Sequence, residues 1–270
     1  MNWTKVDFQM FVGVDGIGLF KYRCSQSVQP APIGCTDWPI LPGLPPGSLV
    51  SSCLVSCWSA MFVWVPGEHF GDEFGKISKI RKVPALRDGD FCLAESVAIM
   101  LYLAEKFQTP DRWFPADLRL RSRVNEYLSW QHSAIRMHGS KMLWMRLMIP
   151  KIMGIDVPKE KMDGALEDLN ASLTLIEENF LQDRPFIVGD QMSLADLVAI
   201  VEIMQPLGAG LDVFEGRPKL SAWRDRVQAS IGKDLFDEAH RGILGAQDSM
   251  KQLDPSKLEL FKPKILRLFF

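Results

Sequence analysis

Two short runs of residues in the first half of the chain could together hold a small peptide. The run Lys82–Leu86 reads as a strand that reaches Pro84, and Glu95-Ser96 stands where a second apolar run gives way to a helical pattern. A strand that stops at a proline leaves backbone N–H and C=O groups that an extended peptide can pair with. A serine at a helix N-terminus offers its hydroxyl and unpaired N–H groups to a carboxylate. The sequence therefore predicts a site for a small, extended, anionic peptide.

The residues around these runs predict the elements that position them. Asp88-Gly89 is typical of a hairpin turn, and apolar residues recur at helical spacing from Ser96 to about Phe107. We expect an antiparallel hairpin plus helix over residues 67–107 and only helices over residues 115–245. The stripes that predict the later helices are Met162, Leu166, Leu169, Leu173, Ile176 and Phe180, then Leu220, Trp223 and Val227, then Leu235, Phe236, Ala239 and Ile243.

Two features of the helical part predict local geometry. The long apolar-periodic stretch Leu118–Ile149 contains Gly139, where we expect a kink, and Pro150, where we expect it to end. The run Leu194–Met204 is apolar nearly all round, which predicts a buried helix. Ser193-Leu194-Ala195-Asp196 has capping-box spacing and should start that helix, a purely structural role.

The composition excludes several classes of function. The 270 residues carry a formal net charge of −2, so no surplus of Lys and Arg indicates nucleic acid or an anionic membrane. The five cysteines are an odd number without Cys-x-x-Cys spacing, which favours a reducing compartment over a disulfide framework. The four histidines lack metal-ligand spacing. We expect a cytoplasmic protein with no nucleic-acid partner and no bound metal.

The first 66 residues differ in kind from the rest. No charged residue occurs between Trp38 and Gly67, and six prolines fall between Pro30 and Pro46. The apolar run Leu49–Val65 is shorter than the ~20 residues that a membrane-spanning helix needs. We therefore expect no membrane span there.

Several motifs resemble the theta class of the cytosolic glutathione transferases, and the resemblance runs from about residue 67 to residue 244. It implies an α+β fold, in which an incomplete thioredoxin-like glutathione-binding domain precedes an all-α C-terminal domain. The implied limits are 67–112 and 113–270, with residues 1–66 as an atypical segment that replaces the start of the first domain. The residues that carry the resemblance are Lys82-Val83-Pro84-Ala85-Leu86, Asp88-Gly89-Asp90-Phe91, Glu95-Ser96-Val97-Ala98-Ile99, Arg123-Val124-Asn125-Glu126-Tyr127-Leu128, Trp130-Gln131-His132, Ser193-Leu194-Ala195-Asp196-Leu197-Val198-Ala199 and Val213-Phe214-Glu215-Gly216-Arg217-Pro218-Lys219-Leu220.

The resemblance fails before Gly67. The family begins with a strand, a turn that carries a catalytic serine, a first helix and a second strand, and here the prolines stand where that helix and strand should be. Each proline inside a helix costs ~3 kcal/mol, so no family-like first helix can form there. Ser25 and Ser27 are candidates for the serine, but without a strand before them the interpretation as ordinary loop serines is favoured. No catalytic residue is assigned.

The resemblance also implies roles for residues of the binding site. Val83 should pair its backbone with the cysteinyl unit of glutathione, with Pro84 in cis holding the strand end. Glu95 should hold the γ-glutamyl amine and Ser96 its carboxylate.

Three further residues have roles that rest on the resemblance alone. Lys82 and His69 should face the glycyl carboxylate of glutathione, although such residues are more often a solvated charge and a structural histidine. Arg136 should lie at the electrophile pocket, where it could attract an anionic leaving group or glutathione itself. An exposed helical arginine with no such role is an equally good interpretation.

The resemblance implies a detoxifying transferase that conjugates the glutathione thiolate to small electrophiles such as alkyl halides, epoxides and peroxides. Glutathione would be its co-substrate, with no other cofactor, and the chain would form a homodimer. Because the catalytic serine has no secure counterpart, we expect weakened conjugation. One alternative is a non-catalytic binding or interaction protein of the same fold. A second, ranked last, is a chloride-channel-like relative that inserts residues 49–65, for which Cys24-x-x-Ser27 is a faint echo that lacks a preceding strand.

Overall fold

The computed structural model describes residues 8–13, 19–23, 71–254, 258–259 and 261–269. The chain divides into two compact units, Met1–Thr109 and Pro110–Phe270. The domain limits 1–66, 67–112 and 113–270 stay predictions. Each unit is described by itself.

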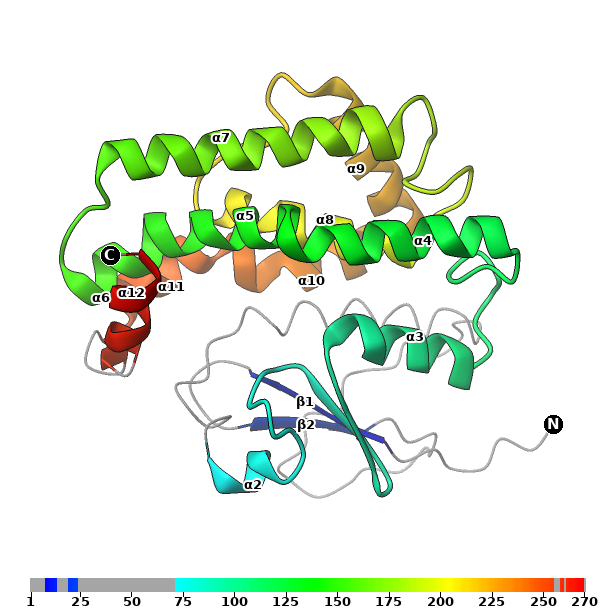
Figure 1. Cartoon of the computed structure of the whole chain (residues 1–270), viewed down its shortest axis with the longest axis horizontal. Helices are drawn as coiled ribbons and strands as arrows, with labels where there is room; N and C mark the ends of the chain where they lie inside the picture. Colours follow the sequence, from blue (N-terminus) through cyan, green and yellow to red (C-terminus); the bar gives the residue numbers. More distant parts are fainter. Residues whose placement is uncertain (1–7, 14–18, 24–70, 255–257, 260, 270) are drawn as a thin grey trace. The chain divides into compact units, whose positions relative to one another are not determined.

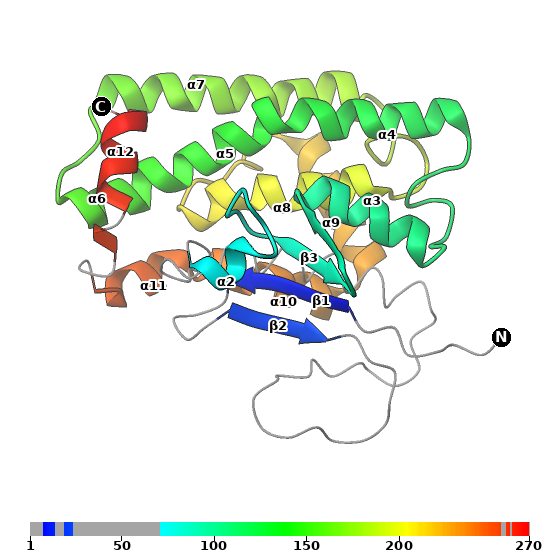
Figure 2. The same ribbon diagram turned by 60° about the horizontal axis from the view of Figure 1, so that its bottom comes forward.

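The first unit is built on a four-stranded sheet in the order β2-β1-β3-β4 (Figures 1 and 2). The strands are β1 (Phe8–Gly13), β2 (Leu19–Arg23), β3 (Ala85–Asp88) and β4 (Phe91–Ala94). All three neighbouring pairs are antiparallel. Helices α2 (Asp72–Gly75) and α3 (Ser96–Lys106) complete the described part of this unit, so the predicted hairpin and helix are confirmed.

The first 66 residues supply two strands, which the sequence did not predict. A strand–helix–strand segment joins parallel neighbours, whereas β1 and β2 are antiparallel and pair from Gln9↔Arg23 to Gly13↔Leu19. Both strands precede the prolines that begin at Pro30, so those prolines do not interrupt them. Because β2 ends at Arg23, the expectation that no strand precedes Cys24 and the serines after it is wrong.

The β3–β4 hairpin is tied to α3 by a polar cluster. Asp88 stands opposite Phe91 in the ladder, so Gly89 and Asp90 form the turn, one residue later than predicted, and Gly89 takes φ +62°. The Asp88 carboxylate accepts hydrogen bonds from Tyr102 and Lys106 of α3. Burial opposes ionisation of Asp88, but these bonds outweigh it and lower its pKa.

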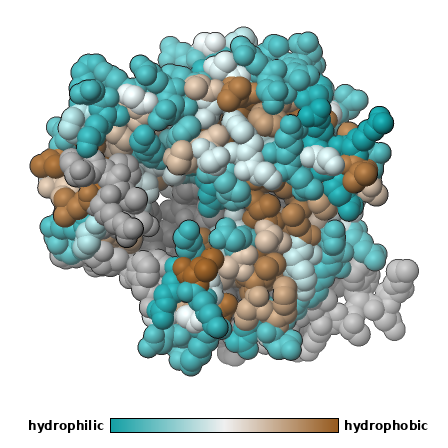
Figure 3. All heavy atoms as spheres, viewed as in Figure 1, coloured by the Kyte–Doolittle hydropathy of each residue, from teal (hydrophilic) through white to brown (hydrophobic). Residues whose placement is uncertain are grey.

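The second unit is helical throughout the residues that the structure describes, as predicted. The elements of this unit are α4 (Leu118–Trp130), the 3₁₀ turn η3 (Gln131–Ser133), α5 (Ile135–Leu143), the π-helical turn η4 (Trp144–Met148), α6 (Ile149–Met153), α7 (Lys159–Leu175), the π-helical turn η5 (Ile176–Leu181), α8 (Leu194–Gly208), α9 (Pro218–Ile231), α10 (Lys233–Leu244), α11 (Ala246–Gln252) and α12 (Lys262–Phe269). The surface over α7, at the top of Figure 3, is mostly hydrophilic.

Helix α8 is the core of this unit. Every residue from Leu194 to Pro206 is buried, and α8 packs against α4, α5, α9 and α10. The predicted capping box at Ser193 is present. The fully buried Asp196 carboxylate accepts four hydrogen bonds, from the Ile187 and Ser193 amides and the Trp223 indole, each at 2.9 Å, and from the Ser193 hydroxyl at 3.1 Å. This one side chain therefore joins the loop before α8, the start of α8 and helix α9.

The helix break in the stretch Leu118–Ile149 lies elsewhere than predicted. Helix α5 runs unbroken through Gly139, and the break falls at η3 and Ala134, whose φ of −120° and ψ of −106° are not helical. The helix also continues past Pro150 and ends at Met153, so the predicted end at Pro150 is wrong. Pro150 is the second residue of α6, which follows the π-helical turn η4 without a break, so the helical conformation is maintained through this proline.

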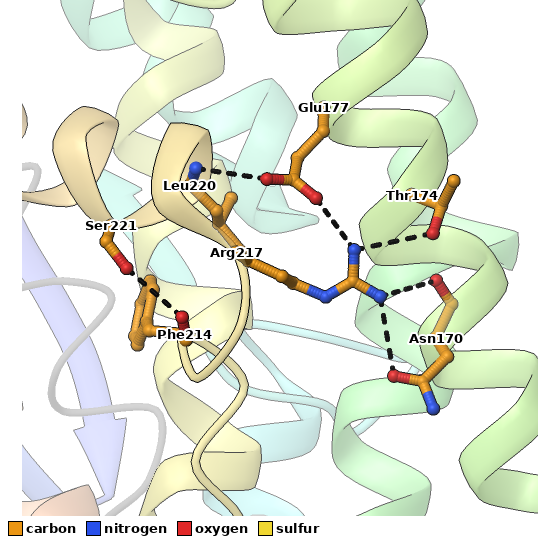
Figure 4. Close-up of polar contacts among 7 residues, drawn as sticks. All are labelled: Asn170, Thr174, Glu177, Phe214, Arg217, Leu220 and Ser221. Carbon is orange, nitrogen blue, oxygen red and sulfur yellow. Dashed lines mark hydrogen bonds and ion pairs between the residues drawn. The ribbon is translucent and has the colours of Figure 1, made fainter.

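Arg217 fixes the segment before α9 against helix α7 (Figure 4). Its guanidinium Nη1 donates to Glu177 Oε2 at 2.7 Å and to Thr174 Oγ1 at 3.4 Å, and Nη2 donates to the Asn170 carbonyl at 3.4 Å. The other oxygen of Glu177 accepts from the Leu220 amide at 3.3 Å. The motif that contains Arg217 therefore has a packing role.

Leu49–Val65, on which the expectation about a membrane span depends, lies outside the described residues. Within the part of the chain that the structure describes, no helix is both long and apolar enough to cross a bilayer.

Hydrogen exchange tests whether the N-terminal strand pairs as described. Because β3 lies between β1 and β4, each of its amides has a neighbour to bond, and we expect residues 85–88 to exchange at least ~100-fold more slowly than an unfolded chain. Edge strand β4 is the internal comparison, since only its amides that face β3 should be protected. Unprotected exchange in residues 85–88 would contradict the pairing of β1 with β3.

Candidate functional site

The start of β3 presents backbone groups outside the ladder. The Val83–Pro84 peptide bond is cis, as the resemblance implied. Ladder pairing of β3 begins only at Ala85, while the half-buried Val83 side chain packs against Phe74 and Ala85. Because that side chain is held in the small core, the Val83 backbone is kept in place where an extended peptide could pair with it.

The end of β4 presents a strained residue followed by a helix start. Glu95 is exposed and has φ +71° and ψ +113°, a conformation rare for any residue other than glycine. Its carbonyl accepts from the Ile99 amide at 2.9 Å, which begins α3. Ser96 is buried, and the first turn of α3 has neither an acidic residue nor a side-chain cap. The amides of this turn can therefore stabilise an anion.

The hairpin register brings these two places together. Ala85, the first residue of β3, stands directly opposite Ala94, the last residue of β4. Partners in an antiparallel ladder have Cα atoms ~5 Å apart, so Val83 and Glu95-Ser96 lie at the same end of the hairpin. Helix α3 packs on both strands of this hairpin and fixes where its N-terminus lies.

The remaining predicted glutathione ligands are placed less fully. Lys82 is exposed and adjoins Val83 at the same end of the hairpin. His69 lies outside the described residues, as do Ser25 and Ser27. The described residues therefore include those predicted to bind one end of a peptide, but none that is assigned to activate a thiol.

Arg136 belongs to the second unit and is not a solitary exposed arginine. It lies in the first turn of α5 with its side chain 28% exposed, and its Nη1 lies 3.2 Å from Oε1 of Glu202, whose side chain is fully buried in α8. The second oxygen of Glu202 accepts a hydrogen bond from the side-chain Nε2 of Gln205. Burial raises the pKa of Glu202 to about 7, although Arg136 and Gln205 favour its charged form.

Gly139 sets the distance between the two helices that carry this ion pair. A Cβ atom at Gly139 would lie 3.0 Å from the backbone carbonyl oxygen of Glu202. Its lack of a side chain lets α5 approach the α8 backbone. This close approach, and not the predicted kink, is the role of the glycine.

Sequence reasoning missed Glu202 and Gln205. The available signal was a carboxylate and an amide inside a helix that is otherwise apolar all round. An ionisable residue that must be buried needs a partner, so Glu202 predicts a cation on a packed helix.

Comparison with known proteins adds the family. Residues 62–105 match the model of the glutathione S-transferase N-terminal domain, and residues 135–230 match that of the C-terminal domain. Bovine glutathione S-transferase theta-1 is 49% identical over 202 residues, which cover 75% of this chain and 84% of the relative.

Solved structures give the same assignment. Human glutathione S-transferase T1-1 in its apo form is 42% identical with a TM-score of 0.73, covering 83% of this chain and 97% of that one. A human theta-class enzyme in complex with the glutathione conjugate of 1-menaphthyl sulfate is 38% identical with a TM-score of 0.71, covering 83% of this chain and 96% of that one.

A glycine pair tests the close α5–α8 contact. Gly139→Ala should lower the free energy of unfolding by ~1–3 kcal/mol, because the methyl group must push the two helices apart. Gly164→Ala in α7 is the matched control: nothing lies within 4 Å of its Cβ position, so it should stabilise by ~0.5–1 kcal/mol. Urea unfolding measures both. Equal gains from both substitutions would show that α5 and α8 are not in close contact at Gly139.

Proposed function

The chain belongs to the theta class of glutathione transferases, and on that premise we propose that it binds glutathione at the shared end of β3, β4 and α3. The observation that carries this proposal is the ladder pair Ala85↔Ala94, which brings Val83 to the same end of the hairpin as Glu95-Ser96. The family's reaction joins the glutathione sulfur to a small electrophile, for which alkyl halides, epoxides and peroxides are the proposed classes.

Each part of glutathione has a counterpart at this end of the hairpin. The Val83 backbone pairs with the cysteinyl unit, as one more strand segment would. The Glu95 carboxylate holds the γ-glutamyl amine, while the Ser96 hydroxyl and the first amides of α3 hold its carboxylate. The positive φ of Glu95 supports a functional role, because strained residues persist where the surrounding structure and the function require them. Lys82 supplies charge for the glycyl carboxylate, and His69 is proposed beside it.

Conjugation needs the thiol to ionise. A free thiol of pKa ~8.5 is only about 3% thiolate at pH 7. A hydroxyl that donates to the sulfur favours the thiolate, and the family uses a serine after its first strand for this purpose. Here a β1–β2 hairpin takes the place of the family's strand–helix–strand start. We therefore propose that this chain binds glutathione but activates its thiol weakly, with Ser25 and Ser27 as the nearest hydroxyls after β2.

The electrophile side of the reaction is assigned to Arg136. As the thiolate sulfur bonds to carbon, the leaving group departs with the electron pair of the broken bond, and a guanidinium beside it stabilises that charge. The human relative that binds the glutathione conjugate of 1-menaphthyl sulfate makes aralkyl sulfate esters a second proposed substrate class. Arg136 suits such esters because its charge is only partly buried.

The wider biochemical setting is proposed on the same premise. The chain acts as a homodimer in the cytoplasm and takes glutathione as co-substrate without a further cofactor. The alternative function, a non-catalytic glutathione-binding protein, is favoured by the β1–β2 hairpin, because it alters the place from which the family supplies its catalytic serine.

Removing one hydroxyl tests the binding site. Ser96→Ala should weaken glutathione binding about tenfold or more, since it removes a hydrogen bond to a charged carboxylate. Titration calorimetry measures the affinity. Ser122→Ala is the matched control, because that exposed hydroxyl bonds only the Leu118 carbonyl of its own helix at 2.7 Å among the described contacts. Equal loss in both variants, or no binding by the unaltered chain, would refute the site.

A further inference from the structure

Glu202 is a buried carboxylate that has one cationic partner among the described residues. Its side chain has no solvent exposure, one oxygen meets Arg136 at 3.2 Å and the other accepts from Gln205. When Glu202 is ionised, the pair with Arg136 has no net charge. When Glu202 is neutral, whether by protonation or by substitution, this carboxylate no longer offsets the positive charge of the partly exposed guanidinium.

Gln205 can serve both charge states of Glu202. Its Nε2 donates to the ionised carboxylate, whereas its Oε1 is buried without a hydrogen-bond partner. An amide can reverse its two ends, and the reversed Gln205 would accept from a protonated Glu202. The site therefore accommodates a neutral group at position 202 with a rotation of one side chain.

Among the described residues, the other titratable groups on the elements packed against α8 do not compensate this charge. Tyr127 on α4 stays neutral, because burial and then Glu202 and Asp196 raise its pKa well above 10. His240, the buried titratable group of α10, stays neutral near pH 7, because burial lowers its pKa to about 4. The Asp196 carboxylate of α8 accepts hydrogen bonds from its own four donors, none of which belongs to the Arg136–Glu202 pair. The buried residues of α9 are Leu220, Trp223 and Val227, none of which is ionisable. Arg136 is the charge that faces Glu202 from α5.

We propose that Glu202 is a specificity-determining residue, which sets the net charge that Arg136 presents to the electrophile. An ionised Glu202 makes the site favour neutral ligands, and a neutral Glu202 makes it favour anionic ones. The proposal rests on the proposed role of Arg136 at the electrophile site. It requires only that a ligand anion beside Arg136 be close enough to feel the Glu202 charge, which an anion one side chain away does.

The pKa of Glu202 gives the pH window of this effect. Its value of about 7 predicts that the neutral form predominates at pH 6 and the ionised form at pH 8. Anion affinity should therefore fall as pH rises through 7.

The experiment compares two ligands that differ in charge. Equilibrium binding of 1-menaphthyl sulfate and of the corresponding neutral alcohol is measured by tryptophan fluorescence at pH 6 and pH 8, without glutathione so that no conjugation competes. The unaltered chain should bind the sulfate at least about fivefold more weakly at pH 8 than at pH 6, with little change for the alcohol. Glu202→Gln should bind the sulfate at pH 8 as tightly as the unaltered chain does at pH 6.

Two further variants complete the design. Glu126→Gln removes the exposed partner of Arg123 at 2.7 Å and should behave like the unaltered chain. The double variant R136M/E202Q leaves no buried charge at the pair and should lose the preference for sulfate at both pH values. Thermal unfolding shows that each variant is folded. If a variant does not fold, the ¹³C signal of the Glu202 carboxyl in the unaltered chain gives a second test, since it should titrate near pH 7.

Four results would overturn the proposal. The pH dependence of sulfate binding could persist in Glu202→Gln, that substitution could shift both ligands equally, or the Glu202 carboxyl could titrate below pH 5 as an exposed glutamate does. If R136M/E202Q kept its preference for sulfate, the proposed role of Arg136 would fail along with it. The glutathione site would be unaffected by that result, because it is measured separately through Ser96→Ala.

Discussion

The buried carboxylate of Asp196 is the constraint on which the helical unit depends. Its four hydrogen bonds fix the loop before α8, the first turn of α8 and the Trp223 indole of α9. A buried ionisable group is stable only with such partners. Because α8 is held at its start, Glu202 further along the same helix meets α5 where Gly139 lets the two backbones approach. The Arg136–Glu202 pair is thus a consequence of how α8 is positioned.

In the first unit, the proposed glutathione site depends in the same way on the register of the β3–β4 hairpin. Ala85 opposite Ala94 places the end of one strand beside the start of the other, and α3 begins there. Strand β1 pairs with the edge of β3 that faces away from β4, and β2 pairs with β1 as an antiparallel neighbour. Under the proposed function, ligand binding is assigned to the β3–β4 hairpin and the start of α3, whereas thiol activation belongs to a serine that the family carries after its first strand.

The sequence predicted what depends on local pattern. The β3–β4 hairpin, the capping box at Ser193 and the burial of α8 follow from turn residues, cap spacing and apolar periodicity, and all are confirmed. It did not predict β1 and β2, because β1 joins the sheet by pairing with β3, more than 70 residues further along the chain, and the prolines after β2 dominate the composition of this segment. From the sequence we expected a kink at Gly139, because glycine has a low helix propensity. Propensity does not reveal that another helix backbone packs against this glycine. The partner of Arg136 was missed for the same reason, since it lies 66 residues away.

The central proposal is that this chain binds glutathione but activates its thiol only weakly. The most direct test is the ultraviolet absorbance of the bound thiolate, recorded from pH 5 to pH 9 at saturating glutathione, after calorimetry has established binding. The account predicts binding with a thiol pKa that stays near ~8.5 and little thiolate at pH 7. Thiolate absorbance already present at pH 6 would contradict the account and would show that a group in this chain has taken the role of the family's serine.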